Sequence, residues 1–320
     1  MNDVVVIGAG AWGTALAMQA ARAGACTVLW ARDAGRAAHI AASRANPRLP
    51  NISLSTDITV THEMPARADA WLLAVPMQYL RTASTLLPLG AGPLVACAKG
   101  VEVGSLRLPL EVLGESRPGT PLAVLTGPNF AHEIAAGLPA AAVVAATDGA
   151  LRRSVAAILG TQAFRLYGND DPVGAQLGGA AKNVIAIAAG AVIGAGLGEN
   201  ARAAMITRGL AELTRLAVAL GGRAETIMGL SGLGDLLLTC TGPASRNFSL
   251  GLALGRGEKL TDILAARSAV TEGVATAPAL VARAGAVELP ICAAVARLVS
   301  GQTTVAEAMG ELLARPRRDE

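Results

Sequence analysis

The chain has 320 residues, enough for two domains with separate cores, and its formal net charge of +3 is too small to indicate a nucleic-acid-binding protein. Hydrophobic residues make up 52% of it but aromatic residues only 2%, so Ala, Val, Leu and Ile must build the core. Four widely spaced cysteines and only three histidines argue against a metal site or a disulfide framework, and they fit a reducing, cytoplasmic environment.

The first half of the chain alternates short apolar runs with Ala-rich segments of helical length. Continuous apolar runs are typical of strands that are buried on both faces of a parallel sheet. The predicted strands are 4–8, 26–31, 69–75, 93–100, 121–127, 140–147 and 163–168. Strands and helices in alternation predict a Rossmann-type, doubly wound α/β domain, which we place at residues 1–175.

After about residue 171 the strand-like runs stop, and Ala/Leu-rich segments separated by glycines and prolines follow. The predicted helices are 180–195, 200–221, 245–255, 261–267, 273–284, 291–299 and 304–315. We therefore expect an all-α domain over residues 176–320, which could pair with a second copy as a homodimer. The longest apolar run, 184–198, is short for a spanning helix and contains several glycines, so no integral membrane segment is expected.

A dinucleotide-binding motif directly follows the first predicted strand. Gly8, Gly10 and Gly13 form GxGxxG, and a helical segment follows them. The first two glycines would let the backbone turn and approach a pyrophosphate, and the third would let helix and strand pack closely. A plain tight turn is the alternative, but the position between a strand and a helix favours the dinucleotide site.

The end of the second predicted strand bears on the choice of cofactor. An acidic side chain at this point usually holds the ribose 2′-hydroxyl of NAD, whereas an arginine can accept the 2′-phosphate of NADP. Arg32 comes first here and Asp33 follows it. The sequence therefore favours NADP(H), with NAD(H) as the alternative.

Other loops follow the later strands. Lys99 ends the fourth predicted strand, and TGPNFA, with Gly127, Asn129 and Ala131, ends the fifth. Ligands collect at the carboxyl edge of such sheets, so we expect these loops to share one crevice, although each alone could be a simple turn.

Lys182 stands in the apolar stretch QLGGAAKNVIAIAAG, with no carboxylate within five residues on either side. An ammonium group in apolar surroundings is costly unless its charge is required there. Either the side chain reaches water, or it faces a cleft that needs a charge or a proton. In the second case the glycines before it would leave room for ligands.

Two further segments of the helical half carry polar groups. Asp235 follows two glycines in GLGD, and Ser245, Arg246 and Asn247 stand together before a helical run. A serine N-cap, the N–H groups of a helix start and an arginine fork make a good phosphate receptor. Taken singly, each segment could equally be a helix cap or a surface ion pair.

With these motifs in view, the chain closely resembles the bacterial NAD(P)-dependent sn-glycerol-3-phosphate dehydrogenases. The matching segments extend from residue 7 to about 275: GAGAWGTALA, LPNISLSTDI, LAVPMQYLR, AKGVE, TGPNFAHEIA, AAKNVIAIAAG, GENARAAMITRG, GLGDLLLTCTGPASRN and TEGV. The resemblance implies reversible hydride transfer between sn-glycerol 3-phosphate and dihydroxyacetone phosphate, which supplies phospholipid synthesis.

The resemblance also implies roles for single residues. Lys182 would be the general acid and base at the C2 oxygen, Asp235 would hold Lys182 or a substrate hydroxyl, and Asn183 would orient the substrate. The implied substrate-binding residues are Lys99, Gly127, Asn129, Lys182, Asp235, Ser245, Arg246 and Asn247. The implied cofactor-binding residues are Gly8, Gly10, Ala11, Trp12, Gly13, Arg32, Lys99, Ala131, Arg246, Val270 and Glu272.

Two positions depart from the family pattern: Ala11 stands where a serine is common, and Asn129 stands where a serine is usual.

Two alternative functions stay open: another two-domain reductase of the 3-hydroxyacid or ketopantoate type, and a non-catalytic NAD(P)-binding sensor. The first would leave the Ser-Arg-Asn cluster without a purpose, and the second predicts that Lys182→Ala has no effect.

Overall fold

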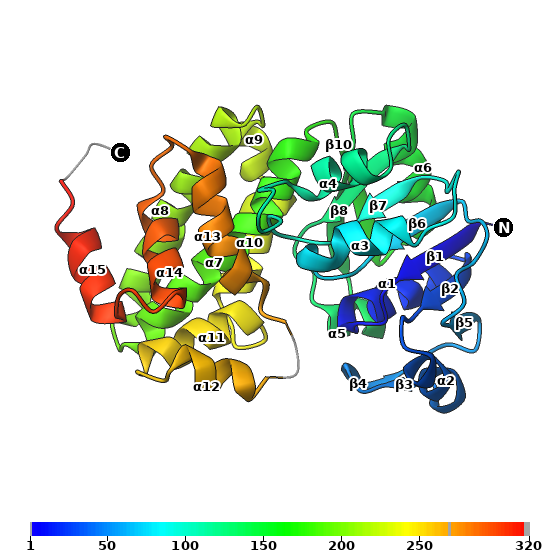
Figure 1. Cartoon of the computed structure of the whole chain (residues 1–320), viewed down its shortest axis with the longest axis horizontal. Coiled ribbons are helices and arrows are strands. Elements are labelled where there is room, and N and C mark those ends of the chain that lie inside the picture. Colours follow the sequence, from blue (N-terminus) through cyan, green and yellow to red (C-terminus); the bar gives the residue numbers. More distant parts are fainter. Residues whose placement is uncertain (1, 268–269, 317–320) are drawn as a thin grey trace. The chain divides into compact units, whose positions relative to one another are not determined.

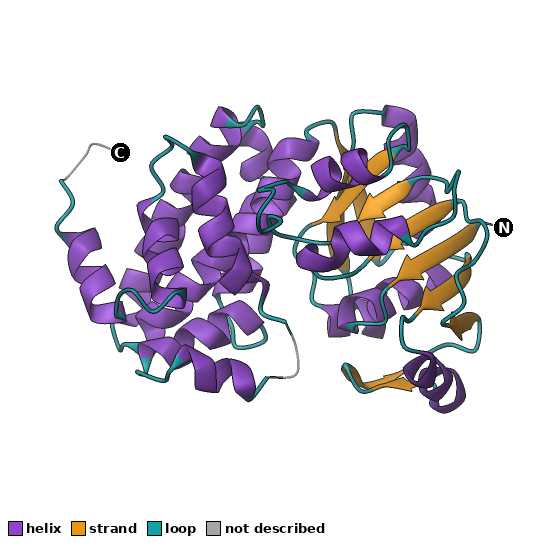
Figure 2. Cartoon of the chain, in the orientation of Figure 1, coloured by secondary structure: helices purple, strands orange, loops and turns teal. Residues whose placement is uncertain are grey.

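The computed structural model describes residues 2–267 and 270–316, and the chain divides into two compact units. The first comprises Met1–Lys99 and Arg107–Gln176, and the second comprises Gly100–Leu106 and Leu177–Glu320. Figure 1 gives the order of the elements, and Figure 2 shows that the sheet belongs to the first unit while the second is helical.

The first unit is built on an eight-stranded sheet with the order β10-β9-β8-β7-β6-β1-β2-β5. Its strands are β1 Asp3–Ile7, β2 Cys26–Trp30, β5 Ile58–Thr61, β6 Ala70–Leu73, β7 Leu94–Ala96, β8 Leu122–Thr126, β9 Ala140–Ala145 and β10 Phe164–Asn169. The chain builds outward from β1 to β2 and β5, then returns to add β6 on the other side of β1. The carboxyl end of β1 is therefore the switch point at which such sheets bind ligands.

The expectation of a wholly parallel sheet is wrong at one junction, because β8 and β9 pair antiparallel. Only the six-residue helix α5 (Ala131–Ala136) lies between them. Six helical residues rise about 9 Å, whereas the five residues of β8 span about 16 Å. The helix is thus too short to carry the chain back to the other end of the sheet. β9 therefore starts at the end where β8 stops and runs in the opposite direction.

The first unit has five α-helices besides α5: α1 Ala11–Arg22, α2 Ala34–Ser43, α3 Leu80–Thr85, α4 Pro109–Ser116 and α6 Gly149–Leu159. Their apolar faces and the sheet enclose a core made mostly of Val, Leu, Ile and Ala. The small hairpin β3–β4 (Ala45–Asn46 and Leu49–Ser53) and edge strand β5 were not among the predicted elements.

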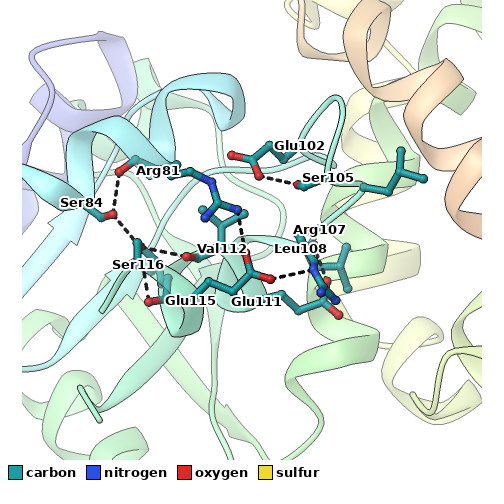
Figure 3. Close-up of polar contacts among 12 residues, drawn as sticks. Arg81, Ser84, Glu102, Ser105, Arg107, Leu108, Glu111, Val112, Glu115 and Ser116 are labelled. Atoms are coloured by element: carbon teal, nitrogen blue, oxygen red, sulfur yellow. Dashed lines mark hydrogen bonds and ion pairs between the residues drawn. The ribbon is translucent and has the colours of Figure 1, made fainter. Parts of the chain in front are cut away.

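Polar contacts tie α3 to α4 (Figure 3). Glu115 accepts from Arg81 and from Arg107, each at 2.9 Å, and the hydroxyls of Ser84 and Ser116 lie 2.8 Å apart. The charged side chains of this network are well exposed, so we expect each ion pair to add little to stability.

The second unit packs around α7 (Pro172–Gly194), a 23-residue helix. Its composition would suit a membrane span, but 89% of the apolar window is buried inside the protein, as in the core helix of a soluble domain. The other helices are α8 Gly198–Ala219, α9 Ala224–Ile227, α10 Asp235–Cys240, α11 Arg246–Gly255, α12 Leu260–Ala265, α13 Glu272–Ala284, α14 Pro290–Val299 and α15 Val305–Leu313. The sequence missed α9, α10 and the π-helical turn Leu230–Gly234 before α10.

Glycines let α7 and α11 touch through their backbones. A Cβ added to Gly190 would lie 2.0 Å from the Phe248 carbonyl oxygen, and one added to Gly251 would lie 2.0 Å from that of Ile187. Real Cβ atoms do not approach so closely, so only glycine fits at these positions. The contact fixes α7 and α11 closely against each other.

A buried carboxylate caps another helix of this unit. Glu212 of α8 is 2% exposed, and it accepts from Ile291 N at 2.6 Å and from Cys292 N at 3.2 Å, at the start of α14. These bonds satisfy N–H groups that a helix start leaves without partners. Burial nevertheless raises the pKa of the Glu212 carboxyl.

Candidate functional site

The glycine-rich loop of the first unit has the shape that a dinucleotide pyrophosphate requires. Gly8 has φ +109°, and a Cβ there would lie 2.8 Å from the Ala74 carbonyl oxygen. A Cβ on Gly13 would lie 1.8 Å from the Gly8 oxygen, which explains the close packing of α1 on β1. A Cβ added to Gly10 would meet no described atom within 4 Å, so the space beside its Cα is open to a ligand. Among the described residues no side chain caps α1, so the first N–H groups of this helix are available to an anion.

The first turn of α1 holds the other two predicted residues of this loop. Ala11 begins the helix and Trp12 follows it, packed against the core of the first unit. Trp12 Nε1 is buried and has no hydrogen-bond partner among the described residues. The departure at Ala11 removes a hydroxyl but keeps the backbone donor.

At the end of β2 the two residues relevant to cofactor choice have different surroundings. Arg32 is exposed, whereas Asp33 is the N-cap of α2 and accepts from Arg36 N at 2.7 Å. One carboxylate oxygen of Asp33 therefore already accepts a hydrogen bond from the protein. In an NAD-specific site, the carboxylate at this position accepts from a ribose hydroxyl instead.

Lys99, Gly127 and Asn129 do come together at neighbouring strand ends of the first unit. Lys99 Nζ donates to the Gly127 carbonyl at 3.2 Å, and Asn129 Nδ2 donates to the Ala141 carbonyl at 3.2 Å. Asn129 Oδ1 is buried and has no partner among the described residues, so it is an acceptor that a ligand hydroxyl could satisfy. Ala131 follows two residues after Asn129, as the first residue of α5.

In the second unit the structure brings Lys182 and Asp235 together. Lys182 is 8% exposed and Asp235 is fully buried, and Lys182 Nζ donates to Asp235 Oδ1 and to Thr239 Oγ1, the latter at 3.0 Å. The lysine thus does not depend on water for its partner. Asp235 and Thr239 direct its ammonium group, which fixes Nζ in one place.

Thr239 is a member of this site that sequence reasoning missed. Its hydroxyl donates to the Asp235 carbonyl at 2.6 Å, so its lone pairs are left to accept from Lys182. The available signal was its spacing, since a residue four positions after Asp235 lies on the same helix face. The neighbouring Cys240 is buried, which raises its pKa to about 12.

Asn183 and Asn247 form a hydrogen-bonded chain that ends on the backbone. Asn247 Oδ1 accepts from Gly273 N at 3.0 Å, and Asn247 Nδ2 donates to Asn183 Oδ1 at 2.9 Å. A backbone N–H can only donate, so it fixes the orientation of both side-chain amides. Asn183 consequently has its NH₂ group, rather than its oxygen, left for a ligand.

The remaining predicted residues lie at two helix starts. Ser245 is the N-cap of α11 and accepts from Phe248 N at 3.2 Å, and Arg246 is exposed beside it. Glu272 begins α13, and Val270, 47% exposed, lies two residues before it.

Arg267 adds a second guanidinium beside Arg246, and the sequence had not indicated it. Arg267 donates to the Arg246 carbonyl at 2.7 Å and to Ser249 Oγ at 3.0 Å. Partial burial and the charge of Arg246 lower the pKa of Arg267. Two arginines at the start of α11 make this end of the helix suitable for an anion. Among the residues described, no cluster of three or more His, Cys, Asp or Glu side chains could hold a metal ion.

Two family models match the chain in succession. The N-terminal model of NAD-dependent glycerol-3-phosphate dehydrogenase matches residues 3–152, and the C-terminal model matches residues 171–310. The NAD(P)-dependent glycerol-3-phosphate dehydrogenase of Acidiphilium cryptum is 57% identical over 99% of this chain and 98% of its own. That of Gluconobacter oxydans is 53% identical over 98% of this chain and 97% of its own.

Solved structures agree with the family assignment. The glycerol-3-phosphate dehydrogenase of Coxiella burnetii superposes with a TM-score of 0.92 at 36% identity, over 98% of this chain and 99% of that one. A ketopantoate reductase of Ralstonia eutropha reaches a TM-score of 0.62 at 18% identity over 96% and 99% of the two chains, and so shares the fold alone. The predicted fold class and the resemblance are confirmed: the chain belongs to the family of NAD-dependent glycerol-3-phosphate dehydrogenases.

Proposed function

We propose that the chain interconverts sn-glycerol 3-phosphate and dihydroxyacetone phosphate with NAD(P)(H). The observation that carries the proposal is the buried group of Lys182, Asp235 and Thr239, in a chain that also has an open glycine loop and belongs to this family. The cofactor, when bound, exchanges a hydride with C2 of the substrate. The protein must therefore manage a proton and a developing negative charge at the C2 oxygen.

In this proposal Lys182 Nζ gives the proton to the C2 oxygen during reduction and takes it back during oxidation. Asp235 keeps the ammonium in place and supplies the counter-charge, so that the site can hold a cation away from water. Thr239 limits the directions in which Nζ can point. Asn183 offers its NH₂ group to a substrate oxygen, and Asn247 holds that group in position.

The proposal assigns the remaining residues by unit. In the second unit, the substrate phosphate is bound at the start of α11 by Ser245, Arg246 and Asn247. The cofactor contacts of this unit come from Arg246, Val270 and Glu272. In the first unit, the substrate contacts come from Lys99, Gly127 and Asn129. The cofactor contacts there come from Gly8, Gly10, Ala11, Trp12, Gly13, Arg32, Lys99 and Ala131.

We also propose a preference for NADP(H), because Arg32 is exposed at the end of β2 while Asp33 caps α2. The proposed setting is the cytoplasm, where the product would supply phospholipid synthesis. Of the four cysteines, Cys97, Cys240 and Cys292 are buried thiols, which suits a reducing compartment. A homodimer through the helical unit is part of the proposal, and light scattering on the purified chain measures its mass.

The experiment that tests the proposed reaction replaces Lys182 with alanine. With dihydroxyacetone phosphate and NADPH or NADH as substrates, kcat should fall by about 10²- to 10⁴-fold, the usual contribution of a general acid. The affinity for either cofactor should change little. Lys259→Ala is the matched control, since Lys259 is an exposed lysine of the same unit. Normal turnover by the Lys182 variant would show that the lysine is not the acid.

A comparison of acceptors separates this proposal from the reductase alternative. Dihydroxyacetone phosphate should be reduced far faster than an unphosphorylated keto acid. The keto acid lacks the phosphate group that Ser245 and Arg246, at the start of α11, would bind. Arg246→Ala should abolish most of that preference. If the keto acid were the better substrate, the proposed substrate class would be wrong.

A further inference from the structure

The start of α13 lies directly against Asn183, the residue that follows Lys182. A Cβ added to Gly273 would lie 2.7 Å from the Asn183 carbonyl oxygen and 2.7 Å from Asn247 Oδ1, so only glycine fits there. Gly273 N donates to Asn247 Oδ1 at 3.0 Å. The first turn of α13 is therefore part of the same polar cluster as Asn183 and Asn247.

Thr271 is the N-cap residue of α13, but its hydroxyl does not cap the helix. An N-cap threonine normally accepts from the N–H group two or three residues later. Here Gly273 N donates to Asn247 instead, and Val274 N donates to the Thr271 carbonyl at 3.2 Å. Both usual donors are thus bonded to other acceptors, and Thr271 forms no side-chain capping bond within the described part of the chain.

The Thr271 hydroxyl is also buried away from water. Thr271 is 6% exposed, and its Oγ1 is buried and has no hydrogen-bond partner among residues 2–267 and 270–316. A buried polar group without a partner destabilises the fold, so native proteins keep few of them. At a functional site such a group can be kept because a ligand supplies the missing partner.

The substrate of the proposed reaction has a group that suits this hydroxyl. In that proposal Lys182 Nζ and the Asn183 NH₂ group face the carbon chain of the substrate from the second unit, and both can only donate. The C1 hydroxyl of the substrate has a proton of its own to donate, so it requires an acceptor. A threonine hydroxyl can accept as well as donate, and Thr271 lies at the helix start that contacts Asn183.

We infer that the Thr271 hydroxyl binds the C1 hydroxyl of dihydroxyacetone phosphate and of sn-glycerol 3-phosphate, and that it makes the site specific for substrates with this group. The inference rests on the proposed function and adds a specificity-determining residue to it. Asn247 takes the N–H group of Gly273 and so keeps the Thr271 hydroxyl free of its usual capping bond.

The test compares dihydroxyacetone phosphate with acetol phosphate, which lacks only the C1 hydroxyl. Thr271→Val keeps the shape of the side chain and removes its hydroxyl. It should lower kcat/KM for dihydroxyacetone phosphate about 10-fold, roughly the effect of losing one hydrogen bond, and leave kcat/KM for acetol phosphate within about twofold. Thr271→Ser keeps the hydroxyl and should keep the wild-type preference. Where acetol phosphate is reduced too slowly to follow, its inhibition constant against dihydroxyacetone phosphate is compared instead.

Thr276→Val is the matched control. Thr276 lies in the same helix, is fully buried, and likewise has no partner for its Oγ1 among the described residues. This variant should leave kcat/KM for both phosphates within about twofold. Since neither hydroxyl makes a bond in the protein, both valine variants should also be at least as stable as wild type in urea unfolding. A less stable Thr271→Val would show that the hydroxyl supports the fold, and this would overturn the inference.

The kinetic outcomes separate the inference from the proposed function. Equal losses for the two phosphates, or no loss for either, would overturn the assignment of Thr271; with no loss, Asn129 Oδ1 would be the remaining acceptor for the C1 hydroxyl. Weaker binding of NADPH alone, with unchanged preference between the phosphates, would place the hydroxyl at the cofactor and also overturn it. If the wild-type chain reduced neither phosphate, the proposed function itself would fail.

Discussion

Removing either partner of the Lys182–Asp235 pair should destabilise the helical unit strongly. Asp235 is fully buried and Lys182 is 8% exposed, so each single change leaves a charge in the interior without its counter-charge. Breaking a buried pair in this way costs about 3–5 kcal/mol, a large part of the roughly 5–15 kcal/mol that stabilises a typical protein. Lys182→Met and Asp235→Asn are the suitable variants, since both nearly keep the volume of the side chain.

The double variant gives the decisive measurement. With both charges gone no uncompensated charge remains, so the loss should be smaller than the sum of the single losses by roughly 2–3 kcal/mol. Thr239→Val is a milder comparison. It removes one hydrogen bond to Nζ, worth about 1 kcal/mol net.

The chain provides separate probes for this assay. Its three tryptophans, Trp12, Trp30 and Trp71, all lie in the first unit, so tryptophan fluorescence follows that unit during urea unfolding. Circular dichroism at 222 nm follows the helices, which dominate the second unit. The losses should therefore appear in the circular dichroism transition. Strictly additive single losses would refute the coupling of Lys182 with Asp235, whatever the variants do to activity.

Three other predictions concern the helical unit and the cysteines of both units. Gly251→Ala should lower the free energy of unfolding, followed by circular dichroism in urea, by at least about 2 kcal/mol, because its Cβ would meet a carbonyl of α7; Gly310→Ala, with nothing within 4 Å, should not. Iodoacetamide at pH 8, followed by mass spectrometry, should modify the exposed Cys26 and spare Cys240, whose pKa of about 12 leaves about one thiolate in ten thousand. Burial raises the pKa of Glu212, so its carboxyl group stabilises the fold most below its unfolded pKa, and this contribution falls as the pH rises through its folded pKa. In urea unfolding, the difference in stability between wild type and Glu212→Gln should therefore be smaller at pH 7 than at pH 4.

The main elements of the fold were predictable because they repeat one pattern. Each central strand is buried on both faces and reads as an unbroken apolar run, and all seven predicted strands are present. The hairpin 45–53 was missed for an equally physical reason. Its sequence is polar, includes Pro47 and Pro50 and has no clear period, and bonds from Asn46 and Arg44 to distant segments hold it.

The candidate site was predictable in part. An isolated lysine in an apolar helix indicated a missing counter-charge, and the family resemblance suggested Asp235 as the partner. Their meeting across 53 residues could not be worked out from local pattern. The orientation of Asn183 was also out of reach, because it depends on a backbone N–H at Gly273.

Gly178, one of the two glycines shortly before Lys182, makes a backbone contact. The sequence suggested that these glycines leave room for ligands, but a Cβ on Gly178 would lie 2.3 Å from the Ser231 carbonyl oxygen. Lys182 follows Gly178 by four residues, and Asp235 follows Ser231 by four, about one helical turn in each segment. The two segments therefore touch at the first turn and pair their charges at the next. The lysine tolerates its apolar surroundings because the glycine one turn earlier brings the π-helical turn, and the aspartate after it, within reach of Nζ.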